Sequence, residues 1–194
     1  MKKLLAVLLL ALSLPAFAAL EVAGVKFDDK AKVGAGDTVI NGAGLRKKFV
    51  VKVYASALYL PQKAATTAEV LAMKGTKRVR IVTLREVSAE DFAGALVSGI
   101  RSNHSDAELA PLNARIDAFK ATMLGIGTVT EGATIHLDWL PEVNAGVTRL
   151  TVNGSTKGND IAGEDFYRAL LKIWIGDKPV QDDLKEHLLG KPHS

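Results

Sequence analysis

One arginine and two tyrosines in the first third of the chain have side chains that could bind an acidic group. Arg46 follows the Gly-x-Gly sequence of residues 42–44, and Tyr54 and Tyr59 lie in the apolar stretch behind it. A guanidinium forms a bidentate, charge-assisted pair with a carboxylate, and a tyrosine hydroxyl adds a neutral donor. Arg46 could equally form an ion pair with an acidic residue on a nearby loop. Tyr54 and Tyr59 are five positions apart, so on a strand they face opposite sides, and we expect one of them to serve packing.

Other candidates for chemistry are weaker. The histidines are His104, His136, His187 and His193. No two of these histidines have the spacing of metal ligands on a helix. The best candidate for a metal-binding pair is His136 with Asp138 on one strand face. No serine lies in a G-x-S-x-G sequence, and residues 157–160 resemble a turn rather than a phosphate-binding loop. The chain has no cysteine, which excludes thiol catalysis and thiolate metal sites. We therefore expect no metal and no cofactor.

The N-terminus has the pattern of an export signal. Lys2 and Lys3 precede an apolar run over residues 4–14, and the small-x-small sequence of residues 16–18 follows it. This pattern predicts a signal peptide over residues 1–18 that is cleaved near Ala18. The run is shorter than the roughly 20 residues that span a bilayer, so no stable membrane anchor is expected after cleavage. An exported chain without disulfides fits a bacterial periplasm.

Length and charge limit the remaining possibilities. The 176 residues after position 18 (194 minus 18) are enough for one domain with a substantial core, over residues 19–194. The formal net charge of +4 falls to +2 without Lys2 and Lys3, and the basic residues are scattered. A nucleic-acid-binding surface needs a concentrated basic stripe, so no nucleic-acid partner is expected. The short basic group at residues 77–80 fits a solvated strand end.

The hydrophobic pattern predicts strands and helices that are largely segregated along the chain. Ser88 resembles a helix cap, and Phe92, Leu96 and Ile100 then form one apolar stripe on a helix of about 14 residues. Further strands are expected over residues 20–27, 38–41, 46–60 (one long strand or a hairpin), 77–84, 133–140 and 147–153, with a turn at 42–44. Further helices are expected over residues 66–74, 105–125 (interrupted by Pro111), around 166–174 and over 179–189. This order predicts an α+β fold.

Four segments in this order resemble bacterial chalcone isomerase-like proteins. They are NGAGLR at residues 41–46, KVYASALYLP at 52–61, the helix capped by S-x-x-D at 88–91, and ALLKIWIGDKPV at 169–180. Together they span nearly all of the predicted mature chain. The resemblance implies an antiparallel β-sheet with helices packed on one face, an open-faced β-sandwich. It also implies a ligand cleft between the helices and the sheet.

The residues of true chalcone isomerases are only partly present. In those enzymes the cleft arginine is joined by a threonine, a tyrosine and an asparagine. Arg46 matches the arginine, whereas Tyr54, Phe92 and Gly99 fall at the other three positions. Losing a hydrogen-bond donor that stabilises developing charge typically lowers the catalytic rate by a factor of about 10²–10³. Neither Phe92 nor Gly99 has a side-chain donor. The resemblance therefore does not imply chalcone isomerisation.

Other relatives with this fold bind fatty acids, and there an arginine and a tyrosine at these places hold the carboxylate. Arg46 and Tyr54 resemble that pattern, and Phe92 becomes an apolar wall for an acyl chain. We therefore predict a non-catalytic periplasmic binding protein for a small apolar carboxylate such as a fatty acid, with Arg46, Tyr54 and Phe92 as ligand-binding residues. Two alternatives stay open: an isomerase or lyase that uses Arg46 on another substrate, and a structural or partner-binding protein whose cleft is closed.

Overall fold

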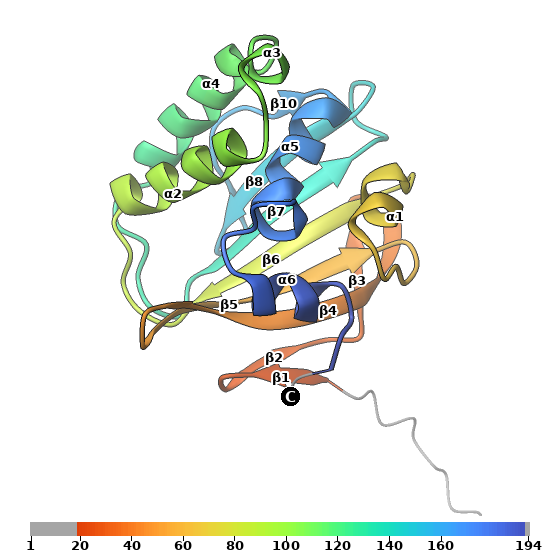
Figure 1. Ribbon diagram of the computed structural model, residues 1–194, viewed down its shortest axis with the longest axis vertical. Helices are drawn as coiled ribbons and strands as arrows, with labels where there is room; N and C mark the ends of the chain where they lie inside the picture. The colour runs from red at the N-terminus through yellow and green to blue at the C-terminus, as the bar shows by residue number, and fades with distance from the viewer. Residues whose placement is uncertain (1–18, 193–194) are drawn as a thin grey trace, which may run out of the picture.

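The centre of the protein is one antiparallel β-sheet of eight strands (Figure 1). The structure is a computed structural model that describes residues 19–192, so the predicted signal peptide lies outside the described residues. Seven strands follow the order β10-β8-β7-β6-β5-β4-β3, and β9 pairs with β8 beside this path. Their bounds are β3 Lys30–Val33, β4 Gly36–Lys48, β5 Val51–Leu60, β6 Lys77–Thr83, β7 Thr134–Leu140, β8 Val147–Val152, β9 Ser155–Thr156 and β10 Ile161–Ala162.

The longer helices cover one face of this sheet, and a small hairpin covers part of the other face (Figure 1). The helices are α1 Thr67–Ala72, α2 Ala89–Ser102, α3 Asp106–Leu109, α4 Asn113–Leu124, α5 Glu164–Ile175 and α6 Asp182–Leu188. The hairpin consists of β1 Leu20–Val22 and β2 Val25–Phe27. This arrangement confirms the predicted α+β class and the packing of helices on one face of an antiparallel sheet.

Two apolar cores lie on the two faces of the sheet. The larger core, between sheet and helices, contains Tyr54, Ile81 and Trp174. The smaller core, beneath the β1–β2 hairpin, contains Phe27 and Tyr59. Tyr54 and Tyr59 therefore face opposite sides of β5, as their spacing predicts, and Tyr54 is the tyrosine on the helix side.

The helix caps follow from local sequence. Ser88 precedes α2, and its hydroxyl accepts a hydrogen bond from the backbone N–H of Asp91 at 3.1 Å. The predicted helix over 105–125 is divided into α3 and α4, which begins at Asn113. Pro111 lies between the two, where its missing N–H removes a helical hydrogen bond.

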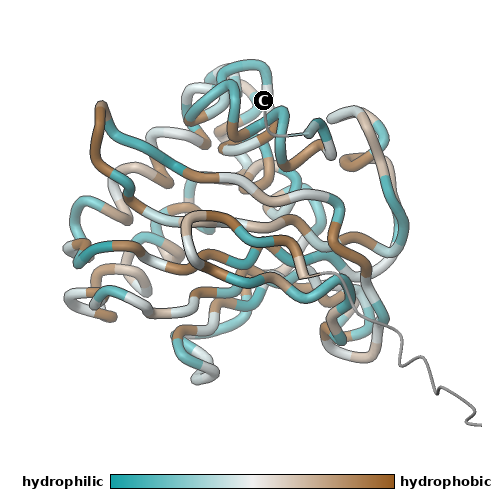
Figure 2. The backbone as a smooth tube through the Cα atoms, turned by 90° about the horizontal axis from the view of Figure 1, so that it is seen from below, coloured by the Kyte–Doolittle hydropathy of each residue, from teal (hydrophilic) through white to brown (hydrophobic). Residues whose placement is uncertain are grey.

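Two expectations about the early strands are wrong. Residues 20–27 form a hairpin rather than one strand, because Ala23 and Gly24 adopt positive φ values of 51° and 84° and turn the chain. Residues 42–44 do not form a turn either: they lie inside the long strand β4, and the chain reverses at Phe49 and Val50. Figure 2, coloured by hydropathy, shows how apolar and polar segments alternate along the strands.

Candidate functional site

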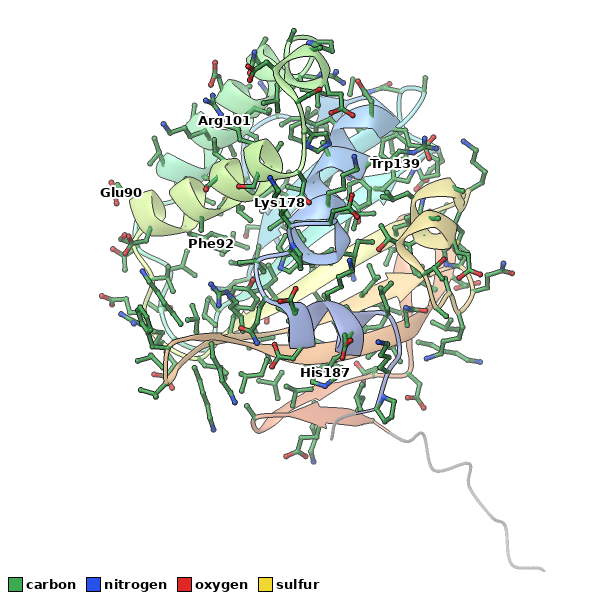
Figure 3. The ribbon with its side chains drawn as sticks, viewed as in Figure 1. Glu90, Phe92, Arg101, Trp139, Lys178 and His187 are labelled. Carbon is green, nitrogen blue, oxygen red and sulfur yellow. The ribbon has the colours of Figure 1, made fainter. Side chains whose placement is uncertain are left out.

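A cleft of about 380 Å³ opens between α2 and the ends of β4 and β5. The three residues predicted to bind a ligand, Arg46, Tyr54 and Phe92, all line this cleft. Its other lining residues come from β4 and β5, the β6–α2 loop, α2, α5 and two further loops: Lys48, Val53, Arg85, Glu86, Val87, Ser88, Asp91, Ala95, Leu96, Thr128, Ile173 and Val180. The lining side chains from α2 and α5 are mostly apolar, whereas those from the end of β4 and from the β6–α2 loop are mostly polar. Figure 3 shows Phe92 on α2, on the side of the helix that faces the sheet.

The glycines before Arg46 allow α6 to lie directly on β4. A Cβ atom on Gly42 would stand 1.9 Å from the carbonyl oxygen of His187, and one on Gly44 would stand 2.7 Å from Cδ1 of Leu184. The His187 oxygen belongs to the backbone, so only glycine fits at position 42, whereas a side chain at position 44 would require Leu184 to shift. A glycine inside a strand often marks such a close approach of another segment, which is a signal that the sequence does contain.

Asn41 holds the C-terminal end of α6 against the sheet. Its side-chain N–H₂ group donates to the carbonyl oxygens of Leu188 at 2.8 Å and Ala64 at 2.9 Å, and its Oδ1 accepts the N–H of Ala64 at 2.8 Å. The register between β4 and β5 shifts between Ile40 and Gly42, which places Asn41 in a β-bulge. The NGAGLR segment therefore holds α6 against the sheet with one amide and two glycines.

Gln181 at the N-terminus of α6 then fixes the strand that carries Arg46. Its Nε2 donates to the carbonyl oxygen of Leu45 at 3.0 Å, and its Oε1 accepts the backbone N–H of Lys47 at 2.8 Å. The same Oε1 accepts a hydrogen bond from Nη1 of Arg46 at 3.1 Å. Neither Gln181 nor Asn41 is identified by the sequence as part of the site, because the contacts between α6 and β4 join residues more than a hundred positions apart.

The guanidinium of Arg46 has only neutral partners within residues 19–192. Nη1 donates to Gln181 and to the backbone oxygen of Lys47. None of the six ion pairs in the described part of the chain involves Arg46. The alternative in which Arg46 pairs with an acid on a nearby loop is therefore wrong for this structure. Its Nε and Nη2 atoms form no hydrogen bond with the described residues, and this is the edge that can hold a carboxylate.

Tyr54 lies directly opposite Arg46 in the β4–β5 pairing, so both side chains project from the same face of the sheet. The buried hydroxyl of Tyr54 accepts a hydrogen bond from Nε1 of Trp174 on α5 at 2.9 Å. An indole N–H can only donate, so the phenol hydrogen stays available for another acceptor. Burial raises the pKa of Tyr54 to about 12, against smaller opposing effects of Trp174 and Arg46, so the hydroxyl stays protonated at neutral pH.

Phe92 and Gly99 on α2 have different roles in the structure. Phe92 is buried and forms part of the apolar wall of the cleft. Gly99 does not line the cleft. A Cβ atom there would stand 2.9 Å from Cγ2 of Ile173, so the glycine allows α2 to approach α5 closely.

Charged groups surround the polar end of the cleft. Lys48 and Arg85 contribute positive charge, and Glu86 and Asp91 contribute negative charge. Together with Arg46 this gives three cations and two anions. Glu86 and Asp91 are not recognisable as site residues from the sequence, because only the fold brings the β6–α2 loop beside the end of β4.

The predicted pair of His136 and Asp138 lies on the other face of the sheet. Arg78 donates to Asp138 through Nε and Nη2, both at 2.6 Å. Burial and the nearby Arg78 and Arg80 lower the pKa of His136 to about 4, so the ring is neutral at physiological pH. Within residues 19–192 no three His, Asp or Glu side chains cluster as metal ligands would. In the same range no helix is long and apolar enough to span a membrane.

Comparisons with known proteins agree with this fold. The crystal structure of an Arabidopsis thaliana fatty-acid binding protein is similar to the structure, with a TM-score of 0.64 and 16% sequence identity. The similarity covers 86% of this chain and 92% of that protein. No curated protein sequence matches the chain. The sequence pattern of the chalcone isomerase-like family matches residues 19–190, and the chain belongs to this family.

Proposed function

We propose that the protein is a non-catalytic binding protein for a small apolar carboxylate such as a fatty acid. The observation that carries this proposal is the Nε–Nη2 edge of Arg46, which has no hydrogen-bond partner among residues 19–192, in a cleft with both apolar and charged lining residues. Ligand pockets typically combine an apolar lining with a few convergent polar groups, and their volumes are roughly 300–1,000 Å³. The cleft of about 380 Å³ lies at the lower end of that range.

The chemistry of the two polar groups fits a carboxylate. Arg46 supplies a fixed positive charge and two parallel N–H donors, which match the two oxygens of a carboxylate. Tyr54 supplies a hydroxyl whose oxygen is already occupied by Trp174, so it meets the ligand as a donor. Phe92 and the neighbouring apolar side chains then face the acyl chain, and burial of each methylene contributes about 0.8 kcal/mol.

The fold comparison supports this proposal in general terms only. The Arabidopsis protein is described as a fatty-acid binding protein, but 16% identity shows a shared fold and not a shared ligand. The proposed location is the periplasm, and its support is the N-terminal sequence pattern of residues 1–18. The third possibility, a closed cleft, disagrees with the open cleft in the structure.

An isomerase or lyase is the second candidate, and one observation favours it. The carboxylates of Glu86 and Asp91 line the same cleft as Arg46. A carboxylate within reach of a substrate proton can act as a general base, while Arg46 stabilises a developing enolate. This candidate predicts turnover of an enone or enol substrate that is lost in Arg46→Ala and reduced in Asp91→Asn.

Native mass spectrometry of residues 19–194 tests the first proposal. A co-purified adduct of fatty-acid mass is expected in the wild-type protein and is expected to be absent in Arg46→Ala. Titration with a fatty acid should show roughly 10- to 100-fold weaker binding by Arg46→Ala, the size of one lost charge-assisted hydrogen-bonding group. The matched control is Arg101→Ala on the exposed face of α2 (Figure 3), which removes the same charge outside the cleft. Equal binding by a folded Arg46→Ala protein would overturn the assigned role.

A further inference from the structure

The tip of the β4–β5 hairpin exposes two large apolar side chains to solvent. Phe49 and Val50 are each 92% exposed, and Val51 beside them is 43% exposed. The tip projects at the end of strands β4 and β5 (Figure 1), and Figure 2 shows it as an apolar segment at the periphery. Leu124, at 40%, is the other large apolar side chain of residues 19–192 with comparable exposure.

The stability of the hairpin does not explain these residues. The loop between Lys48 and Val51 has two residues, and Phe49 has a φ of +56°. Two-residue hairpin loops favour Gly, Asn or Asp at such positions, because a bulky L-residue is strained there. Lys47 and Lys52 are also directly opposite each other in the pairing, where like charges repel. Two local features, the positive φ of Phe49 and the Lys47–Lys52 pair, therefore oppose folding at this solvated tip.

The charged residues of the hairpin itself are all positive. Residues 42–60 contain Arg46, Lys47, Lys48 and Lys52, and they contain no Asp or Glu. Lys47 and Lys52 form one cross-strand pair, and Lys48 pairs with Val51 one position nearer the tip. Successive pairs project from opposite faces of a hairpin, so exposed cations lie on both faces behind Phe49 and Val50.

We propose that this tip docks on an anionic lipid membrane surface. Phe49 and Val50 insert among the head groups, and Lys47, Lys48 and Lys52 contact lipid phosphates. Apolar residues combined with basic neighbours are the pattern of interfacial membrane binding, in which burial and attraction to anionic lipid act together. A specific protein interface buries about 1,000 Å² or more with a complementary shape, which two side chains at a narrow tip do not offer.

The position of the tip connects the membrane with the cleft. Lys48 lines the cleft and is adjacent to Phe49, and Arg46 lies two residues further along the same strand. A docked tip therefore places the polar end of the cleft at the level of the lipid head groups, where an amphiphilic ligand can pass between bilayer and protein. This consequence rests on the proposed ligand, whereas the docking itself does not depend on it.

Vesicle sedimentation tests the docking without any added fatty acid. We expect residues 19–194 to bind vesicles of phosphatidylcholine with phosphatidylglycerol, to bind phosphatidylcholine vesicles much more weakly, and to dissociate at high salt. The double variant Phe49→Asn with Val50→Ser removes the apolar tip, and asparagine tolerates the positive φ. Its binding should be roughly 10- to 100-fold weaker. The matched control, Leu124→Ser, removes an exposed apolar side chain of α4 and should bind as the wild type does.

A charge-reversal variant tests whether the lysines of the hairpin contribute to membrane docking. Lys52→Glu should weaken binding to the anionic vesicles by about tenfold or more, because each basic residue near such a surface adds attraction. Lys26→Glu, on the exposed side of β2, makes the same change outside the hairpin and should have little effect. Fatty-acid affinity measured without vesicles should be unchanged in the Phe49/Val50 variant, so the two proposals can fail separately.

Two results would overturn the docking proposal. One is equal binding of anionic vesicles by the wild type and by the folded Phe49/Val50 variant, or no binding by either. The other is a wild-type dimer in size-exclusion chromatography that the same variant abolishes, because the tip would then be a contact between copies of the chain.

Discussion

Two arginines project from opposite faces of the same sheet, and their partners differ in charge. On the hairpin side, Arg78 forms a bidentate ion pair with the buried carboxylate of Asp138, at 2.6 Å for both hydrogen bonds. On the helix side, Arg46 lines the cleft and donates only to neutral oxygens, and its Nε and Nη2 atoms form no hydrogen bond with residues 19–192. Of these two arginines, Arg78 is neutralised by a carboxylate and Arg46 is not.

This difference separates a structural role from a binding role. A charge that is already paired and removed from water contributes to the fold, and it has little attraction left for a ligand. A charge that is held in place by neutral groups keeps its attraction for an anion. Sequence alone does not tell which of the two arginines is paired, since Arg46 and Arg78 both lie in predicted strands beside other basic residues. The following variants test this distinction, beginning with the largest expected effect.

Arg78→Ala should lower the free energy of unfolding by about 3 kcal/mol, because it leaves the Asp138 carboxylate buried without its partner. Burial already raises the pKa of Asp138, and the bond to Arg78 opposes that shift. Urea denaturation measures the change. Asp138→Ala and the double variant complete a mutant cycle, which should show strong coupling between the two residues. Additive effects in the cycle would mean that the ion pair does not explain the stability of this face.

Gly42→Ala should cost roughly 1–3 kcal/mol, because the new Cβ atom overlaps the His187 carbonyl oxygen and forces α6 away from β4. The displaced helix carries Gln181 with it, so ligand affinity should fall as well. Gly94→Ala on α2 is the matched control: nothing lies within 4 Å of its Cβ position, and alanine should stabilise the helix by roughly 0.5–1 kcal/mol. A stable Gly42→Ala protein with unchanged affinity would contradict the role of α6 in holding Arg46.

The glycine segment shows what the sequence could predict and what it could not. The β-branched and aromatic residues after Arg46 predict the strand correctly, because strand preference is a local property. The Gly-x-Gly sequence has two local explanations, a turn or a close approach of another segment. Only the position of α6, more than 130 residues later in the chain, decides for the close approach.

The site residues show the same limit. Family resemblance predicts that Arg46, Tyr54 and Phe92 line one cleft, and in the structure all three line one cleft. The groups that support them are not predictable in this way. Trp174 has the spacing of a core residue on α5, and nothing in that pattern indicates that its N–H meets Tyr54, which lies 120 positions away. Hydrogen bonds between distant segments depend on tertiary packing, which hydrophobic periodicity does not encode.

His136 gives the hairpin-side face a pH dependence. The unfolded chain binds a proton at this residue near pH 6.5, whereas the folded protein does so only near pH 4. The free energy of unfolding should therefore fall as the pH falls from about 6.5 to about 4, by on the order of 1–2 kcal/mol after solvent screening of the half-buried ring. Thermal unfolding of wild type and His136→Gln across this range isolates the contribution. Parallel curves for the two proteins would show that the ring titrates as it does in water.

Arg46→Ala should change the free energy of unfolding by less than about 0.5 kcal/mol, although it removes a charged side chain from the sheet. The Oε1 of Gln181 keeps its hydrogen bond from the Lys47 N–H at 2.8 Å, and the exposed Lys47 carbonyl can bind water instead, so no buried group loses its partner. Urea denaturation beside Arg78→Ala compares the two faces directly. A loss as large as that of Arg78→Ala would make Arg46 a structural residue. Little loss of stability together with loss of the bound ligand would show that its charge is used for binding.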